Sequence, residues 1–188
     1  MMSALQFVKE YVKQPRTVGA VMPSSKVLAR QMVEAIAFDR VENIAEFGPG
    51  TGVFTEEILR RKRDGTMLLV IEENREFFEL LHERYSKRDD VVVIHGSAED
   101  VRGHMQAYGI GHLDAIVSGL PFASLPNDVS HAILRVTNQV LAPGGVFVTF
   151  QYSVMKKGLF ERYFAGMEWQ RVWWNVPPAY VLAARPMK

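Results

Sequence analysis

Cysteine is absent from the 188 residues of this chain. That absence excludes a disulfide framework and a thiolate metal site, and it is typical of a protein that works in a reducing compartment. The five histidines show no metal-ligand spacing, so we expect no bound metal. Apolar runs of the length needed for a membrane span or a signal peptide are missing as well. Together these absences predict a cytoplasmic protein.

An excess of charge of one sign is also missing, because 22 lysines and arginines face 21 aspartates and glutamates. The formal net charge of +1 gives no general electrostatic attraction to nucleic acid. Repeats and low-complexity tracts are absent too. Hydrophobic residues are abundant, at 48%, and this content suits one compact domain with a sizeable core.

Three glycines spaced two apart, Gly48, Gly50 and Gly52, form the most informative stretch of the sequence. A short apolar run precedes them and a segment with helical periodicity follows, which predicts a strand, a tight turn and the start of a helix. Glycine lets a ligand lie against the backbone, and the amides of a helix start favour a negatively charged group. Twenty residues after Gly52, a second apolar run ends in Glu72, whose carboxylate can accept both hydroxyls of a ribose. The pattern indicates a nucleoside-containing cofactor.

Apolar runs and amphipathic segments alternate through the rest of the chain. Five buried strands are expected at residues 44–47, 67–71, 91–94, 113–117 and 146–150. A short helix near residues 158–165 should then lead to two more strands, 170–176 and 180–184. Only Pro177-Pro178 joins these two, which is too short for a crossover helix and makes them antiparallel. The expected fold is α/β, a Rossmann-like, doubly wound, seven-stranded sheet with helices on both faces and a C-terminal hairpin.

Two amphipathic segments precede the glycine turn and lie outside the repeating sheet unit. We expect residues 1–38 to form a helical lid or membrane-contact segment, and residues 39–188 to form the cofactor-binding core. The first helix combines an apolar stripe with Lys9, Lys13 and Arg16. A helix of this kind can lie in a membrane interface with its basic residues on anionic head groups. The alternative is a stripe that packs on the sheet as an ordinary lid.

The turn Glu46-Phe47-Gly48-Pro49-Gly50-Thr51-Gly52 differs from the dinucleotide fingerprint, which would need its third glycine at Val53. It resembles instead the first motif of the class I methyltransferases that use S-adenosylmethionine (SAM). In that family the turn wraps the methionine part of SAM, and the acid that ends the second strand holds the ribose. The resemblance implies SAM as the cofactor. It also implies a SAM site made of Glu46, Gly48, Pro49, Gly50, Thr51, Gly52, Glu72, Ser97, Ala98 and Ser118.

Two of these positions carry alternatives. Glu46 is expected to contact the methionine amine of the cofactor, directly or through water, or else to cap backbone amides of the glycine turn. Ser97 occupies a position where many relatives have an aspartate for the adenine amine, so the backbone of Ala98 and the side chain of Glu99 are the substitutes. All of these residues fall at the carboxyl ends of expected strands, where the ligand crevice of a doubly wound sheet lies.

A narrower resemblance combines residues 16–25, the glycine turn and Ser118-Gly119-Leu120-Pro121. Together these motifs resemble the bacterial phospholipid N-methyltransferases, which convert phosphatidylethanolamine stepwise to phosphatidylcholine. The resemblance extends to about Gln151. It implies a phospholipid substrate and a protein associated peripherally with the inner face of the membrane, through contact of the N-terminal helix with anionic lipid.

The glycine turn and the Leu-Pro-aromatic sequence are also similar to the rRNA adenine dimethyltransferases, whose fourth strand ends in Asn-Leu-Pro-Tyr or Asn-Leu-Pro-Phe. This chain has Gly119 where that asparagine would be, and it lacks the helical extension and the basic excess of the RNA enzymes. Methylation of rRNA adenine is therefore the alternative to lipid methylation. A methyltransferase for a small soluble amine and a SAM-binding scaffold without catalysis also stay open.

An ethanolamine nitrogen must lose its proton before it can attack a methyl group. Desolvation lowers its pKa, and a nearby carboxylate or tyrosine could take the proton. A quaternary product prefers aromatic faces, for which Phe122, Phe150 and Tyr152 are candidates near the ends of the fourth and fifth strands. Phe150 is more simply explained by core packing. The expected residues of the reaction site are therefore Tyr152, Phe122 and the backbone of Gly119.

Overall fold

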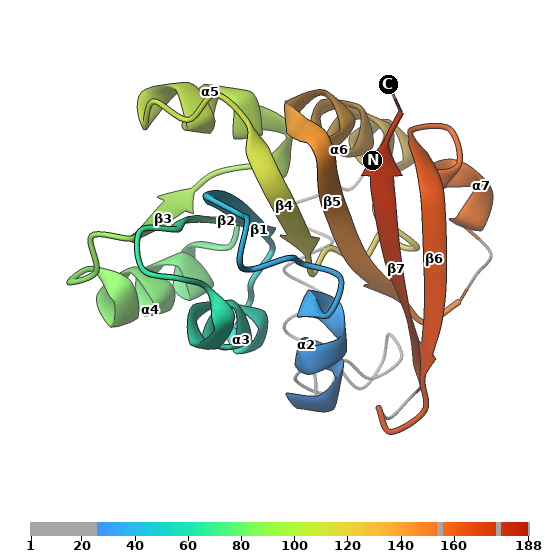
Figure 1. Ribbon diagram of the computed structural model, residues 1–188, viewed down its shortest axis with the longest axis horizontal. Helices are drawn as coiled ribbons and strands as arrows, with labels where there is room; N and C mark the ends of the chain where they lie inside the picture. Colours follow the sequence, from blue (N-terminus) through green and yellow to red (C-terminus); the bar gives the residue numbers. More distant parts are fainter. Residues whose placement is uncertain (1–25, 154–155, 176–177, 188) are drawn as a thin grey trace.

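The computed structural model describes residues 26–153, 156–175 and 178–187 (Figure 1). Its strands form one sheet in the order β3-β2-β1-β4-β5-β7-β6. The strands are β1 (Asn43–Phe47), β2 (Met67–Glu72), β3 (Val91–His95), β4 (Leu113–Ser118), β5 (Leu141–Gln151), β6 (Phe164–Val172) and β7 (Ala179–Pro186). All pairings among β1 to β5 are parallel, whereas β7 is antiparallel to both β5 and β6. The predicted seven-stranded α/β sheet with its C-terminal hairpin is confirmed.

Helices cover both faces of this sheet (Figure 1). The helices on one face are α2 (Lys26–Val33), α3 (Val53–Arg61) and α4 (Arg75–Tyr85). Those on the other face are η1 (Ala98–Asp100), α5 (Val101–Ala107), α6 (Asn127–Val140) and α7 (Lys157–Phe160). A separate cluster of buried apolar side chains fills each interface between helices and sheet. Because both faces are covered, the central strands consist of nearly continuous apolar residues.

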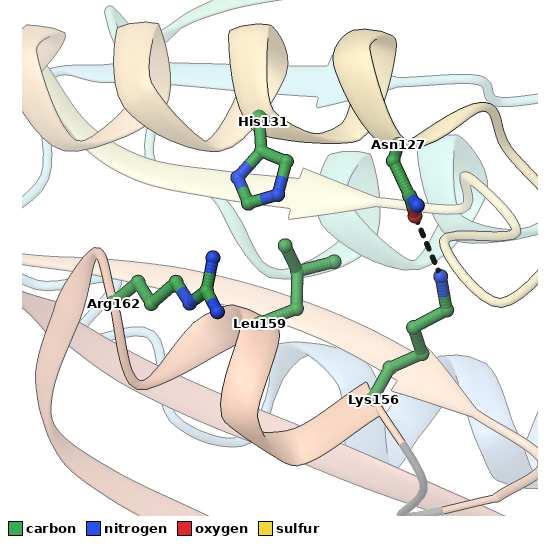
Figure 2. Close-up of a pocket in the computed structure, with 5 residues that line it drawn as sticks. All are labelled: Asn127, His131, Lys156, Leu159 and Arg162. Carbon is green, nitrogen blue, oxygen red and sulfur yellow. Dashed lines mark hydrogen bonds between the residues drawn. The ribbon is translucent and has the colours of Figure 1, made fainter.

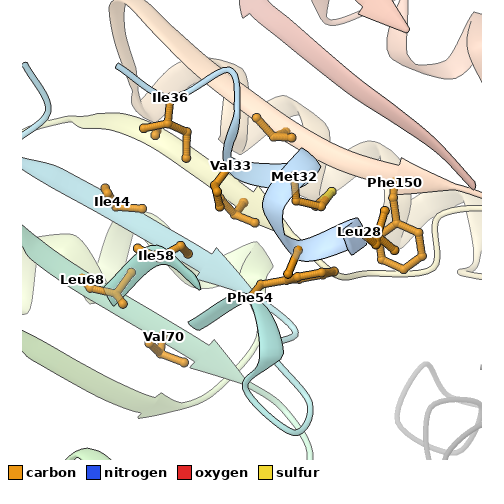
Figure 3. Close-up of a cluster of buried hydrophobic side chains, with 14 of the residues drawn as sticks. Leu28, Met32, Val33, Ile36, Ile44, Phe54, Ile58, Leu68, Val70 and Phe150 are labelled. Atoms are coloured by element: carbon orange, nitrogen blue, oxygen red, sulfur yellow. The ribbon is translucent and has the colours of Figure 1, made fainter. Parts of the chain in front are cut away.

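Helix α2 is a layer of this body. Its Leu28 and Met32 are completely buried, in one cluster with Phe54 of α3 and Phe150 of β5 (Figure 3). Burying an apolar side chain of this size stabilises a fold by about 1.5–3 kcal/mol. The helix cannot leave the sheet without exposing these side chains, so α2 belongs to the core and does not form part of a movable lid.

Two sequence expectations fall on residues 1–25, which lie outside the described residues. They are the amphipathic helix with Lys9, Lys13 and Arg16, and the motif at residues 16–25. Within the part of the chain that the structure describes, no helix is both long enough and apolar enough to cross a membrane.

The start of the C-terminal hairpin differs from the prediction. Helix α7 ends at Phe160, whereas a helix was expected near residues 158–165, and β6 begins at Phe164, before the expected start at residue 170. Phe164 pairs with Pro186 across the hairpin and is only 3% exposed. Strand pairing and core packing therefore decide the structure of this segment, and they outweigh its local sequence pattern.

Candidate active site

The glycine turn between β1 and α3 has one open position. Gly48, Gly50 and Gly52 all have a positive φ, which strains any other residue type. A Cβ on Gly48 would lie 2.7 Å from Leu120 Cδ2, and one on Gly52 would lie 2.8 Å from Leu81 Cδ2. A Cβ on Gly50 would meet no described atom within 4 Å. The backbone at Gly50 therefore faces open space, where a ligand can lie against the turn.

The other two residues of the turn hold its shape through their carbonyl groups. The Pro49 carbonyl accepts a hydrogen bond from the Gly52 N–H at 3.0 Å. The Thr51 carbonyl accepts one from Arg84 Nη1 of α4 at 3.2 Å, and Arg84 also pairs with Glu56 of α3 at 3.2 Å. Helix α4 thereby braces the turn from outside.

Glu72 ends β2 and reaches the same turn. Its Oε2 accepts a hydrogen bond from the Gly50 N–H at 3.0 Å, and its Oε1 accepts one from the Asn74 N–H at 2.8 Å. The side chain is almost fully buried, and burial raises its pKa. A carboxylate offers about four lone-pair positions, so its acceptor capacity is not exhausted by these backbone amides and that of Glu73, and a donor of a ligand beside Gly50 can still bind. This geometry fits the ribose-binding role expected for Glu72.

Glu46 lies in β1 and is completely buried. Its Oε2 accepts a hydrogen bond from Thr55 Oγ1 at 2.7 Å, whereas its Oε1 has no partner among the described residues. Burial is the main cause that raises the pKa of Glu46 to about 8, and the charge of Glu72 raises it further. Thr55 belongs to the first turn of α3 rather than to the glycine turn. A cationic ligand group, such as an ammonium, would satisfy the free oxygen.

The end of β3 supplies fewer free side-chain atoms. Ser97 caps η1, because its Oγ accepts a hydrogen bond from the Glu99 N–H at 3.2 Å. Ala98 is 8% exposed and begins η1, and the Glu99 side chain is exposed. The backbone of Ala98 and the carboxylate of Glu99 are thus what this strand end offers to a ligand, and their contact with the adenine amine stays a prediction.

Gly119, directly after β4, lies against the glycine turn. Its N–H donates to the Phe47 carbonyl at 2.8 Å, and the preceding Ser118 is fully buried with its Oγ accepting from the Leu120 N–H at 3.3 Å. A Cβ on Gly119 would lie 2.5 Å from the carbonyl oxygen of Gly48. Since that neighbour is backbone, no side chain fits at position 119 unless the turn moves. The close approach explains why glycine occupies this position.

The expectation that Phe122 forms part of an aromatic wall is wrong. The ring is completely buried, with edge contacts to Phe147 at 6.2 Å and to Phe160 at 5.4 Å between centroids. These rings belong to the cluster under α5, α6 and α7, on the other side of the sheet from Phe54 and the glycine-turn helix. The short turn after Pro121 directs Phe122 inward, where its apolar area is removed from water.

Tyr152 follows β5 and is half-buried beside Phe150, with their ring centroids 5.5 Å apart. Phe150 is 8% exposed and also contacts Phe54, so it is a core residue. Burial raises the pKa of Tyr152, and a hydrogen bond with the Asn175 side chain lowers it by less. The phenol therefore keeps its proton near neutral pH. Tyr152 can offer a ring face to a ligand, but it is a poor general base.

A separate pocket of about 250 Å³ lies between α6 and α7 (Figure 2). It is lined by Asn127, His131, Lys156, Leu159 and Arg162, and the Lys156 ammonium donates to Asn127 Oδ1 at 3.1 Å. The pocket has a cationic lining, yet it shares no residue with the glycine turn or with the ends of β2 and β3. It is therefore distinct from the predicted cofactor site.

Several contacts of this site could not be found from the sequence. Thr55 donates to Glu46, and Arg84 donates to the carbonyl of Thr51 in the glycine turn. In each pair the two residues are far apart in the sequence, so no local sequence pattern predicts the contact. The partner of Tyr152, Asn175, lies in the connection between β6 and β7, more than twenty residues along the chain. Asn74 is the exception, because asparagine before a helix is a recognisable N-cap, and its Oδ1 accepts from two N–H groups of α4.

Known proteins resemble the chain in sequence and in fold. The model of one family, described as ribosomal RNA adenine dimethylase, matches residues 20–166. An ornithine lipid N-methyltransferase of Singulisphaera acidiphila is 32% identical over 184 residues, which are 97% of this chain and 95% of that protein.

Two solved structures show the same fold. TrmN from Thermus thermophilus matches 86% of the chain with a TM-score of 0.66 at 15% identity, and this chain spans about half of TrmN (49%). The O-methyltransferase from Bacillus cereus, in complex with SAH, matches 97% of this chain and 90% of its own with a TM-score of 0.64 at 14% identity.

Proposed function

The chain belongs to the ribosomal RNA adenine dimethylase family of SAM-dependent methyltransferases, and from that premise we propose that it methylates the amine of a membrane lipid. The proposed acceptors are phosphatidylethanolamine and its mono- and dimethylated forms, with phosphatidylcholine as the final product. The relative with 32% identity is named for a lipid substrate, which supports a lipid amine and adds ornithine lipid as a second acceptor to test.

The observation that carries this proposal is the contact between Gly119 and Gly48. A flipped adenine is read by hydrogen bonds to its edge, and the similar RNA enzymes supply such bonds from an asparagine at this position. Here even a Cβ at residue 119 would lie 2.5 Å from the Gly48 carbonyl oxygen. The glycine turn therefore leaves no room for the amide that would read adenine, although the family is named for that reaction.

SAM is the cofactor of this enzyme. When bound, it supplies a methyl group that its sulfonium makes electrophilic. We propose that Glu72 accepts hydrogen bonds from the ribose hydroxyls, that the Gly50 backbone lies along the methionine part, and that Oε1 of Glu46 accepts from the ammonium. These residues contribute alignment and exclusion of water, which is most of what a methyl transfer to an amine requires.

On the acceptor side, we propose that Tyr152 contributes a ring face. Its raised pKa leaves the phenol protonated, so the lipid amine must lose its proton to solvent as it is desolvated. The ring then lies beside a nitrogen that becomes permanently charged with the third methyl group, and cation–π attraction favours that product. The backbone of Gly119 borders the same space but offers no side chain.

Labelled methyl transfer from SAM tests the proposal directly. Four acceptors are compared: vesicles with phosphatidylethanolamine, vesicles with ornithine lipid, free ethanolamine and rRNA. Label in either lipid supports the proposal and identifies the head group. Label in adenosine without label in lipid would reverse it in favour of the RNA alternative, and label in free ethanolamine alone would make this a small-amine enzyme.

The division of the chain into residues 1–38 and 39–188 stays a proposal. In it, Lys9, Lys13 and Arg16 hold the protein peripherally at the cytoplasmic face of the membrane by attraction to anionic lipid. Since α2 packs into the core, the proposed membrane contact involves only residues 1–25, which precede this helix.

Substitutions at Tyr152 should separate a ring face from an acid–base role. Tyr152→Phe keeps the ring and is expected to retain most activity, with a stability loss of about 0.5–1.5 kcal/mol from the lost hydrogen bond with Asn175. Tyr152→Ala should slow transfer to the dimethylated lipid by roughly 5- to 30-fold, because a desolvated cation–π contact contributes about 1–2 kcal/mol. Initial rates on each methylated form measure this. A phenylalanine variant as slow as the alanine variant would instead place the phenol in proton transfer.

Glu46 should make the free protein less stable as pH rises. Below about pH 4.5 both the folded and the unfolded chain hold this proton, and between 4.5 and about 8 only the folded chain keeps it. Compared with Glu46→Gln, the wild-type protein should therefore lose on the order of a few kcal/mol of unfolding free energy between pH 5 and pH 8. Denaturant unfolding without cofactor at several pH values measures the difference. Parallel pH profiles of the two proteins would contradict the buried protonated acid.

A further inference from the structure

Two tryptophans at the end of β6 are strongly exposed, Trp173 by 64% and Trp174 by 86%. Most tryptophans of folded proteins are largely buried, since each carries a large apolar area. The Arg171 guanidinium lies 3.7 Å from the centroid of the Trp173 ring and 5.4 Å from that of Tyr180 on β7. We call Arg171, Trp173 and Trp174 the tryptophan tip. It presents aromatic surface and positive charge to the outside.

The tryptophan tip lies at the same edge of the sheet as the candidate site. Because β7 is antiparallel to both β5 and β6, β6 runs in the direction of β5, and the arrowheads of β4, β5 and β6 point to one edge (Figure 1). That edge carries the glycine turn, Glu72 and Tyr152. The hydroxyl of Tyr152 is hydrogen-bonded with the side chain of Asn175, the residue after Trp174. The tip is therefore joined to the acceptor side of the site.

The positive charge of the tryptophan tip comes from one arginine. Arg171 pairs with Tyr180 in the hairpin register, whereas Arg185 of β7 pairs with Ala165 and donates to the Gly144 carbonyl at the opposite end of the hairpin. Arg171 makes no ion pair with any of the described residues. Its guanidinium is therefore available to an anion while it is held on the Trp173 ring, and the planar group suits a phosphate. One unpaired cation on an exposed aromatic surface is suited to an anionic lipid head group, although the whole chain is nearly neutral.

We propose that the tryptophan tip docks the catalytic edge of the enzyme onto the head-group layer of an anionic bilayer. Indole rings favour this layer, because the ring enters the apolar boundary while the N–H stays hydrated, and Arg171 can reach the lipid phosphates. Docking in this orientation brings Tyr152 close to the lipid head groups. The inference rests on the proposed lipid function, and it adds an attachment point that is independent of the N-terminal segment.

A bilayer fits this surface better than two other occupants. Aromatic rings and arginine also stack on single-stranded nucleic acid, but such sites combine them with a basic groove, and the net charge here is only +1. A second copy of the chain would meet the same cationic tip, and the two arginines would repel each other. RNA binding and self-association are therefore outcomes that the test must exclude.

The test compares the full-length protein with Trp173→Ser/Trp174→Ser and with Arg171→Glu on vesicles of phosphatidylethanolamine and phosphatidylglycerol. Co-sedimentation and quenching of tryptophan fluorescence by brominated lipid report docking. The double variant should bind vesicles at least about tenfold more weakly, because it loses the apolar area of two rings. Arg171→Glu should weaken binding to anionic vesicles more than to phosphatidylcholine vesicles. Both variants should keep wild-type SAM affinity and thermal stability, because the three side chains lie outside the cofactor site.

The matched control is Tyr108→Ser. Tyr108 is 52% exposed, but it lies between α5 and β4, at the opposite edge of the sheet. This variant should bind vesicles like the wild-type protein. On vesicle lipid the double tryptophan variant should show a raised KM, whereas on a dispersed short-chain lipid amine its kcat should match the wild type.

The outcomes separate this inference from the function on which it rests. If the wild-type protein docks through the tip but methylates no lipid, the docking surface stands and the proposed acceptor fails. If vesicle lipid is methylated and the double variant sediments like the wild type, the docking surface fails and the function stands. Tip-dependent binding to RNA without binding to vesicles, or a tip-dependent dimer that ignores lipid, would also overturn the proposal.

Discussion

Replacing Gly50 by valine is expected to weaken SAM binding by roughly 10- to 100-fold while the protein still folds. A Cβ on Gly50 would meet no described atom within 4 Å, so the valine side chain is expected to extend into the space proposed for the ligand. A steric clash of this size is expected to reduce the binding free energy of SAM by about 1–3 kcal/mol, and each 1.4 kcal/mol changes an affinity about tenfold. Calorimetric titration with SAM measures the effect.

Gly65→Val is the matched control for this substitution. Gly65 also has a positive φ, at 83°, and a Cβ there would likewise meet no described atom within 4 Å. It lies before β2, at the edge of the sheet opposite to the site. Both variants should lose a similar amount of stability to backbone strain, about 1–2 kcal/mol, but only the one at Gly50 should lose SAM affinity. Equal SAM affinity of the two variants would show that the cofactor does not pass over Gly50.

Introducing asparagine at Gly119 should damage cofactor binding without creating an adenine methyltransferase. The Cβ would lie 2.5 Å from the Gly48 carbonyl oxygen, so the glycine turn has to shift. We expect a loss of about 1–3 kcal/mol in unfolding free energy and a weaker affinity for SAM, since the turn itself is displaced. Chemical denaturation and SAM titration measure the two effects, and label transfer to rRNA measures the third.

Gly103→Asn controls for the chemistry of that substitution. Gly103 lies in α5, where a Cβ would meet no described atom within 4 Å, so asparagine should leave both stability and SAM affinity nearly unchanged. An asparagine variant at Gly119 that binds SAM normally and methylates adenosine would contradict the argument from the Gly48 contact. That result would favour methylation of rRNA adenine over methylation of a lipid amine.

The features predicted correctly from the sequence depend on local backbone geometry or on short covalent links. Spaced glycines after an apolar run require a turn, and a hairpin joined by Pro177-Pro178 has no alternative to antiparallel pairing. Glu72 follows from the same logic, because a parallel neighbour of β1 must end beside the turn. These are constraints that a few residues impose on their own.

The features that the sequence did not predict depend on contacts between distant residues. Phe122 was expected in an aromatic wall near the ends of the fourth and fifth strands, whereas its ring packs against Phe147 and Phe160 in the core, a contact between distant residues. The sequence indicated a missing asparagine and an available backbone at Gly119 but not its contact with Gly48, since that contact arises when β4 pairs with β1. A local sequence pattern predicts neither the packing of Phe122 nor the contact between Gly119 and Gly48.

The free oxygen of Glu46 has a consequence for the end of the catalytic cycle. Glu46 holds a proton near neutral pH, so in the proposed site it would release that proton on accepting the ammonium of SAM, and we expect cofactor binding to exchange a proton with the buffer. The demethylated product keeps the same ammonium and ribose as SAM. In the proposed site, Glu46 and Glu72 would therefore bind spent and fresh cofactor alike, and we expect the contacts that give affinity for SAM to cause product inhibition as well.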